Sequence, residues 1–100
     1  MFIAMNRFKI FSDKETQFEK IWKERDTYLE GVKGFKKFNL LKSEKHEDYT
    51  LYASHSVWNS KEDFINWTKS EEFRSAHKNA GQHKDLYLGA PQFEGFEIVL

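Results

Sequence analysis

Seventeen aromatic residues constrain the fold of this 100-residue chain more than any other feature of its sequence. Ten are Phe, four are Tyr and three are Trp, yet the mean hydropathy is only −0.78. A folded protein of this mass exposes roughly 6,000 Å² and has room for one core. So many rings on a small polar chain predict either a subunit interface or a pocket for a flat apolar ligand.

Charge and composition narrow the class of protein. Sixteen Lys and Arg balance sixteen Asp and Glu, whereas a nucleic-acid binder normally carries a basic excess. No apolar run approaches the roughly 20 residues of a membrane helix, so we expect no membrane partner. The chain has no cysteine, which excludes disulfides, thiolate metal sites and cysteine nucleophiles. Because MFIAMNRFKI has the pattern of a strand and not of a signal peptide, we expect a cytoplasmic protein.

The first half of the chain predicts a strand, a helix and a hairpin. Residues 2–10 alternate, and Asn6 is the lone amide on their more apolar face. Residues 12–15 have the pattern of a capping box, and the helix that follows should end at Gly31. Its inner stripe contains Phe18, Ile21, Trp22, Arg25 and Leu29. Two strands, 35–43 and 49–58, are joined by a short polar turn and should pair as an antiparallel hairpin.

The second half predicts a divided helix and a last strand. Asn59 and Ser60 begin a short helix, and Ser70 begins a second one that closes at Gly81. A loop over 82–92 precedes a strand in which Phe96, Ile98 and Leu100 alternate. We therefore predict one α+β domain over residues 1–100, a ferredoxin-like βαββαβ fold with a four-stranded antiparallel sheet and helices on one face. The sheet face left bare predicts a homodimer.

Three side chains stand out as candidates for chemistry. His77 lies on the apolar stripe of its helix, where it is either a core histidine satisfied by backbone or an axial ligand for a metal in an apolar pocket. Asn6 either ties to a neighbouring backbone group or donates a hydrogen bond into a cavity. For Trp67, which lies beside Phe64, packing is the default explanation. His46, His55 and His83 have the settings of surface or structural residues.

These positions carry a resemblance to a known family. Asn6, together with Trp67 and His77 in VWNSKEDFINWTKSEEFRSAHKNAG, resembles the Asn/Trp/His signature of IsdG-type heme-degrading monooxygenases. That family belongs to the antibiotic biosynthesis monooxygenase (ABM) superfamily of dimeric α/β barrels. The segments MFIAMNRFKI, LYASHSVW and LYLGAPQFEGFEIVL are similar to the heme-utilisation oxygenases of Gram-negative bacteria, so the resemblance extends over nearly the whole chain.

The resemblance implies a role for each residue. His77 would be the proximal ligand of heme iron, neutral at its coordinating nitrogen, and Asn6 would hydrogen-bond an oxygen-derived ligand on the distal side. Trp67 would press on the porphyrin and favour a ruffled ring. Heme would serve as both cofactor and substrate, with O₂ and an external electron donor, such as a reductase, opening the ring and freeing iron. Arg25 is a candidate partner for a heme propionate.

Two other functions remain open at the level of sequence. An ABM-type enzyme could oxidise an aromatic or quinol substrate without a cofactor, which would leave His77 without a role as a ligand. A non-catalytic heme-binding protein would form a complex that survives reductant and oxygen. The fold alone does not choose among them, because it carries unrelated activities.

Overall fold

The computed structural model describes residues 1–77 and 80–100 and has the predicted order of elements. The strands and helices are β1 (Phe2–Phe11), α1 (Glu15–Glu24), β2 (Phe35–Lys45), β3 (Tyr49–Trp58), α2 (Lys61–Thr68), α3 (Glu71–His77) and β4 (Gln92–Glu97). A 3₁₀ segment, Ala80–Leu86, precedes β4 where we expected a loop, and non-helical His83 interrupts it.

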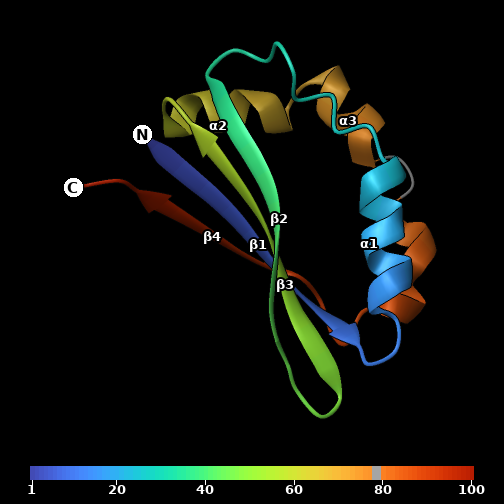
Figure 1. Cartoon of the computed structure of the whole chain (residues 1–100). Coiled ribbons are helices and arrows are strands. Elements are labelled where there is room, and N and C mark those ends of the chain that lie inside the picture. The colour runs from blue at the N-terminus through green and yellow to red at the C-terminus, as the bar shows by residue number, and fades with distance from the viewer. Residues whose placement is uncertain (78–79) are drawn as a thin grey trace.

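The four strands form one antiparallel sheet in the order β2-β3-β1-β4. The helices lie on one side of this sheet, and its other face is uncovered (Figure 1). Together these features confirm the ferredoxin-like α+β prediction. Asn6 pairs with Ser54 of β3 and Phe93 of β4, which places it at the middle of the sheet.

Helix α1 differs from its prediction at both ends. The capping box is wrong: the helix begins at Glu15 after an N-cap at Lys14, with no capping side-chain hydrogen bond, and Asp13 has φ 72°. The Glu15 carboxylate instead accepts a hydrogen bond from Thr50 Oγ1 at 2.7 Å, so it ties the helix to β3. The helix also stops at Glu24 and not near Gly31, because Arg25 is extended and Asp26 Oδ1 accepts from Tyr28 N at 2.9 Å.

The divided second helix is confirmed at its junction. Ser60 caps α2 by accepting from Asp63 N at 3.1 Å. Ser70 Oγ accepts from Phe73 N at 3.1 Å and donates to Trp67 O at 2.6 Å, so it closes α2 and begins α3. The helix is described as far as His77; the predicted continuation over residues 78 and 79 lies outside the described residues.

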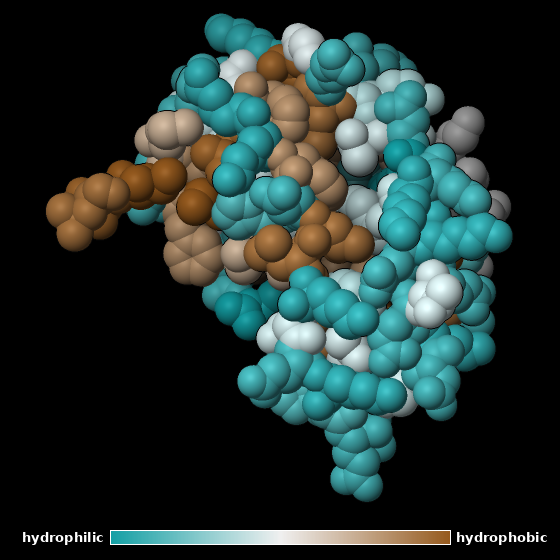
Figure 2. All heavy atoms as spheres, in the orientation of Figure 1, coloured by the Kyte–Doolittle hydropathy of each residue, from teal (hydrophilic) through white to brown (hydrophobic). Residues whose placement is uncertain are grey.

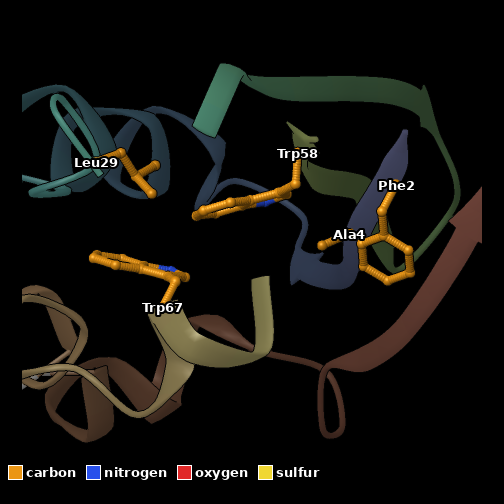
Figure 3. Packing of buried hydrophobic residues seen from close by; sticks show 5 residues of the cluster. All are labelled: Phe2, Ala4, Leu29, Trp58 and Trp67. Carbon is orange, nitrogen blue, oxygen red and sulfur yellow. The ribbon is translucent and has the colours of Figure 1, made fainter. Parts of the chain in front are cut away.

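The buried core is divided into two clusters at opposite ends of the sheet. The first cluster consists of Phe2, Ala4, Leu29, Trp58 and Trp67 (Figure 3). The second consists of Phe8, Ile10, Phe18, Tyr52 and Leu86. The folded chain exposes 6910 Å², more than the roughly 6,000 Å² expected for its mass, as a hollow and an uncovered sheet face require.

In the part of the chain that the structure describes, none of the helices has the length and apolar character needed to cross a lipid bilayer.

Candidate functional site

A pocket of about 870 Å³ lies between the sheet and the helices. Its walls come from β1, β2, β3, β4, from all three helices and from the segment after α3. Asn6, Trp67 and His77, the three residues singled out from sequence, all line it. The volume is near the upper end of the usual range for small-molecule sites, roughly 300–1,000 Å³, so the pocket suits a large ligand.

His77 is held in one tautomer at the end of α3. Its Nδ1 lies 2.8 Å from the carbonyl oxygen of Phe73, and because a carbonyl only accepts, the proton must be on Nδ1. The neutral ring therefore carries its lone pair on Nε2. The ring also stacks on Phe73, with centroids 4.1 Å apart.

The charge state of His77 suits a metal ligand. His77 remains exposed, but partial burial of its ring lowers the pKa below the usual 6.5, and the positive charge of Arg25 lowers it further against the Phe73 hydrogen bond. The imidazole is thus neutral at pH 7. A neutral imidazole with a fixed tautomer is the form that binds iron or zinc.

The side-chain amide of Asn6 lines the pocket and is not hydrogen-bonded to the described backbone. Among the hydrogen bonds of the described residues, none involves its side chain, although it lines the pocket between Ala4 and Phe8. On the neighbouring strand, Ser54 and Ser56 add two hydroxyls to the same wall. The sheet side of the pocket therefore carries polar groups, and the Asn6 amide is available to a ligand.

Trp67 belongs both to the core and to the pocket wall. It is 6% exposed and lies 6.2 Å from Trp58 between ring centroids, with Leu29 nearby (Figure 3). Phe73 packs edge-on against it at 5.6 Å. This packing fixes the indole, so a ligand in the pocket would meet a rigid aromatic surface.

The charged residues of the pocket lining are both cationic. Arg25 and Lys84 are its charged residues, and the described lining contains no carboxylate. Arg25 Nε donates to Ala76 O at 2.9 Å, and the guanidinium lies 4.7 Å from the ring centroid of Trp22. Burial lowers the pKa of Arg25, yet no carboxylate of the described residues lies within ion-pair distance of it. A half-buried cation without an anion is suited to an anionic ligand.

The described residues contain no group of three or more histidines or carboxylates able to hold a bare metal ion. A metal in this pocket would have to bring other ligands with it. One free imidazole nitrogen, apolar aromatic walls and two cations fit an iron porphyrin, which is flat, apolar and carries two carboxylates.

The remaining histidines lie away from the pocket lining. His46 stacks on Tyr49, with centroids 4.7 Å apart, in the turn after β2. His55 faces the uncovered side of the sheet opposite Met5, and its buried Nδ1 has no partner among the described residues.

Several pocket residues were not anticipated from sequence. Ser54 and Ser56 share the alternation of Tyr52 on β3, so strand periodicity could have placed them on the inner face. Lys84 lies in the 3₁₀ segment and Tyr87, whose pKa is raised by burial, directly follows it; this part of the chain has no periodic pattern in its sequence.

Comparison with known proteins agrees with this geometry. A family model described as "Antibiotic biosynthesis monooxygenase" matches residues 1–79. A protein named heme oxygenase (staphylobilin-producing) from Staphylococcus epidermidis is 39% identical over 59 residues, 57% of this chain and 55% of the relative. A heme-degrading monooxygenase from Bacillus mycoides is 37% identical over 60 residues, 60% of this chain and 56% of the relative. The match spans about half the length of these curated relatives.

Solved structures share the fold over the whole chain. The heme degrader MhuD from Mycobacterium tuberculosis, with two hemes bound in its active site, aligns with a TM-score of 0.75 and 25% identity, covering 100% of this chain and 97% of that one. SnoaB, a cofactor-independent oxygenase from Streptomyces nogalater, aligns with a TM-score of 0.70 and 19% identity over 99% of this chain and 93% of that one. The second similarity shows the fold alone.

Proposed function

Because the chain belongs to the antibiotic biosynthesis monooxygenase family, we propose that it is a heme-degrading monooxygenase. It binds heme through His77 and oxidatively opens the porphyrin with O₂ and reductant, which releases the iron. The observation that carries this proposal is the pocket itself: a neutral imidazole, a fixed indole and an amide line one cavity beside two cations, and within the described part of the chain neither His77 Nε2 nor the amide has a hydrogen-bond partner. The relatives named as heme degraders support it.

Each residue has a separate task. His77 Nε2 ligates the iron, while the Nδ1 hydrogen bond to Phe73 O fixes the ring. Asn6 supplies an amide N–H on the sheet side of the pocket, where it would donate a hydrogen bond to the bound substrate pair of heme and O₂. Trp67 provides a rigid aromatic surface that presses on the macrocycle. Bound heme supplies the redox chemistry; the protein supplies ligation, orientation and a water-poor cavity.

Arg25 and Lys84 are the proposed partners of the heme carboxylates. Arg25 uses its Nε to donate a hydrogen bond to Ala76 O, so both terminal nitrogens can bind a carboxylate. A guanidinium binds a carboxylate in a bidentate way. Lys84 adds a second positive charge to the same pocket. Their placement would orient the ring relative to His77.

We propose a homodimer as the working unit, a single domain over residues 1–100 and an external reductase or small reductant as electron donor. The uncovered sheet face presents Ile3, Met5, Leu41 and Phe96, and the apolar C-terminal residues extend beyond the body of the molecule (Figure 2). A second copy would bury both. We propose the cytoplasm as the location, because it supplies the reducing equivalents that the reaction needs.

The decisive experiment is a hemin titration followed by ascorbate in air. We expect a sharpened Soret band that bleaches as iron is released. His77→Ala should lose tight coordination, whereas His46→Ala, a histidine in the exposed turn, should behave as wild type. A Soret band that persists under reductant would indicate a heme-binding protein without activity. The absence of a Soret band would instead favour an enzyme that oxidises an organic substrate without a cofactor.

A further inference from the structure

A buried tyrosine lies outside the pocket but is joined to it by a chain of aromatic rings. Tyr52 of β3 is 1% exposed, between α1 and the sheet. Its ring centroid lies 4.8 Å from that of Phe18, which is equally buried. Phe18 in turn lies 6.3 Å from Trp22, and Trp22 lines the pocket. An electron therefore has a short path through aromatic contacts from Tyr52 to the pocket wall.

The Tyr52 hydroxyl also has a proton acceptor. It donates to Glu19 Oε2 at 2.5 Å, and the same oxygen lies 3.4 Å from Lys42 Nζ. The Glu19 side chain is 36% exposed, so it connects the buried phenol to solvent. A carboxylate hydrogen-bonded to a phenol can take its proton without any movement of heavy atoms.

The charge states favour proton transfer only after oxidation. Burial, and then the Glu19 hydrogen bond, raises the pKa of Tyr52. The Tyr52 hydrogen bond, aided by Lys42, holds the pKa of Glu19 below its usual value. At neutral pH the phenol is thus protonated and the carboxylate ionised. Loss of an electron makes a phenol strongly acidic, and only then does the proton move.

We propose that Tyr52 is a redox-active tyrosine that gives one electron to the pocket, through Phe18 and Trp22, and its proton to Glu19. This inference rests on the proposed function only for its oxidant, a one-electron oxidant formed in the pocket when bound iron porphyrin reacts with peroxide. The oxidant takes one electron from Trp22. Tyr52 then returns one electron to the Trp22 radical and loses its hydroxyl proton to Glu19 Oε2, which leaves a neutral tyrosyl radical and a protonated carboxyl group. Ascorbate restores Tyr52 by giving it one electron while Glu19 returns the proton, and the proton of the oxidised ascorbate goes to solvent.

Arg25 explains why the radical does not remain at Trp22. Its guanidinium lies 4.7 Å from the Trp22 ring centroid, so a positive charge on the indole is electrostatically disfavoured. A neutral tyrosyl radical carries no such charge. The pathway would draw stray oxidation away from His77 and Trp67 toward a residue whose proton acceptor, Glu19, is in contact with solvent.

The first test uses the ligand-free protein. Azide radicals made by pulse radiolysis oxidise tryptophan, and the transfer to tyrosine is followed by the loss of the indolyl signal and the rise of the tyrosyl signal. We expect Tyr52→Phe to lose most of this rise and Glu19→Gln to slow it. Tyr49→Phe is the matched control, because Tyr49 is on the same strand but on the opposite face, stacked on His46. A full tyrosyl rise in Tyr52→Phe would overturn the proposal.

The second test uses the hemin complex with hydrogen peroxide, read by electron paramagnetic resonance and by mass spectrometry of oxidised residues. We expect a tyrosyl signal that disappears in Tyr52→Phe, with oxidation then shifting to pocket residues. Oxidation of Tyr87 in the wild type, with Tyr52 untouched, would refute the pathway. If hemin does not bind, the proposed function is refuted. The radiolysis result alone then decides whether Tyr52 is redox-active.

Discussion

At the scale of single residues, the pocket combines groups that are each held by one specific contact. The Phe73 carbonyl oxygen fixes the tautomer of His77. The carbonyl oxygen of Ala76, the residue just before His77 on α3, holds Arg25 in position. Asn6 differs, because its side chain forms no hydrogen bond with any described residue. The proposed function thus assigns the preorganised groups to ligand binding and the unpaired amide to the reaction.

Asn6→Ala should separate binding from turnover. Removing one positioned hydrogen-bond donor typically lowers a catalytic rate by on the order of 10²-fold, and we expect that loss in heme degradation with hemin affinity nearly unchanged. Single-turnover bleaching beside a hemin titration measures both. Asn39→Ala is the control, since Asn39 lies opposite His55 on the uncovered sheet face. Wild-type degradation by Asn6→Ala would contradict the assignment.

The lowered pKa of His77 predicts a pH dependence with a definite sign. The unfolded chain takes up the proton near pH 6.5 and the folded protein only at lower pH, so the free energy of unfolding should fall as pH drops through this window. Hemin ligation should likewise hold at pH 6.5 and weaken below it. Nuclear magnetic resonance of the ligand-free protein gives the pKa of His77 directly, and Arg25→Gln should raise it because a nearby positive charge is removed. A His77 pKa above 6.5 in the wild type would contradict this prediction.

At the scale of elements, the junction between α2 and α3 determines which residues share the pocket. Ser70 closes one helix on Trp67 O and caps the next at Phe73 N. In an unbroken helix Trp67 and His77 would be ten residues apart and about 80° apart around the axis. The break lets two helices in different directions present both side chains to one cavity.

Ser70→Ala tests this junction. Loss of the cap should lower the free energy of unfolding by about 1 kcal/mol and, because His77 ends the short helix that Ser70 begins, weaken hemin ligation as well. Ser60→Ala removes the cap of α2 and should cost a similar amount without the same effect on hemin. Thermal unfolding and hemin titration of both variants make the comparison, and equal hemin affinities would show that the junction does not position His77.

Some elements could be predicted from the sequence and others could not. Strand alternation placed Asn6 on the inner face correctly, and capping residues located α2 and α3, because both signals depend on neighbours in sequence. The same logic was wrong for α1. Glu15 accepts a hydrogen bond from Thr50 on β3 and does not cap the N-terminus of its own helix. Asp26 accepts a hydrogen bond from Tyr28 N just after the helix ends. The Arg25 and Tyr52 contacts are likewise long-range and have no signal in local periodicity.

At the scale of the whole molecule, one face of the sheet is packed and the other is uncovered (Figure 1). Phe96 is 44% exposed and Leu41 is 41% exposed on that uncovered face, so large apolar side chains are in contact with water there. The proposed dimer would stack two such faces.

Phe96→Asp should convert the dimer to a monomer, because two copies would bury an unpaired charge at their shared face. Sedimentation velocity measures the change. Ile65→Asp is the control, an exposed apolar residue of α2 on the helical side of the molecule. A monomeric wild type, or an unchanged mass in Phe96→Asp, would contradict the proposed assembly.

The division of the core into two clusters has a consequence for cooperativity. The first and second clusters are separate groups of buried residues on one sheet, joined at their edges by the stack of Trp22 on Phe38, so each can open as its own unit. Amide hydrogen exchange should therefore resolve two opening free energies in the ligand-free protein. A macrocycle in contact with both would link them, and the two should merge into one, so that the ligand completes the folding unit as well as occupying the site.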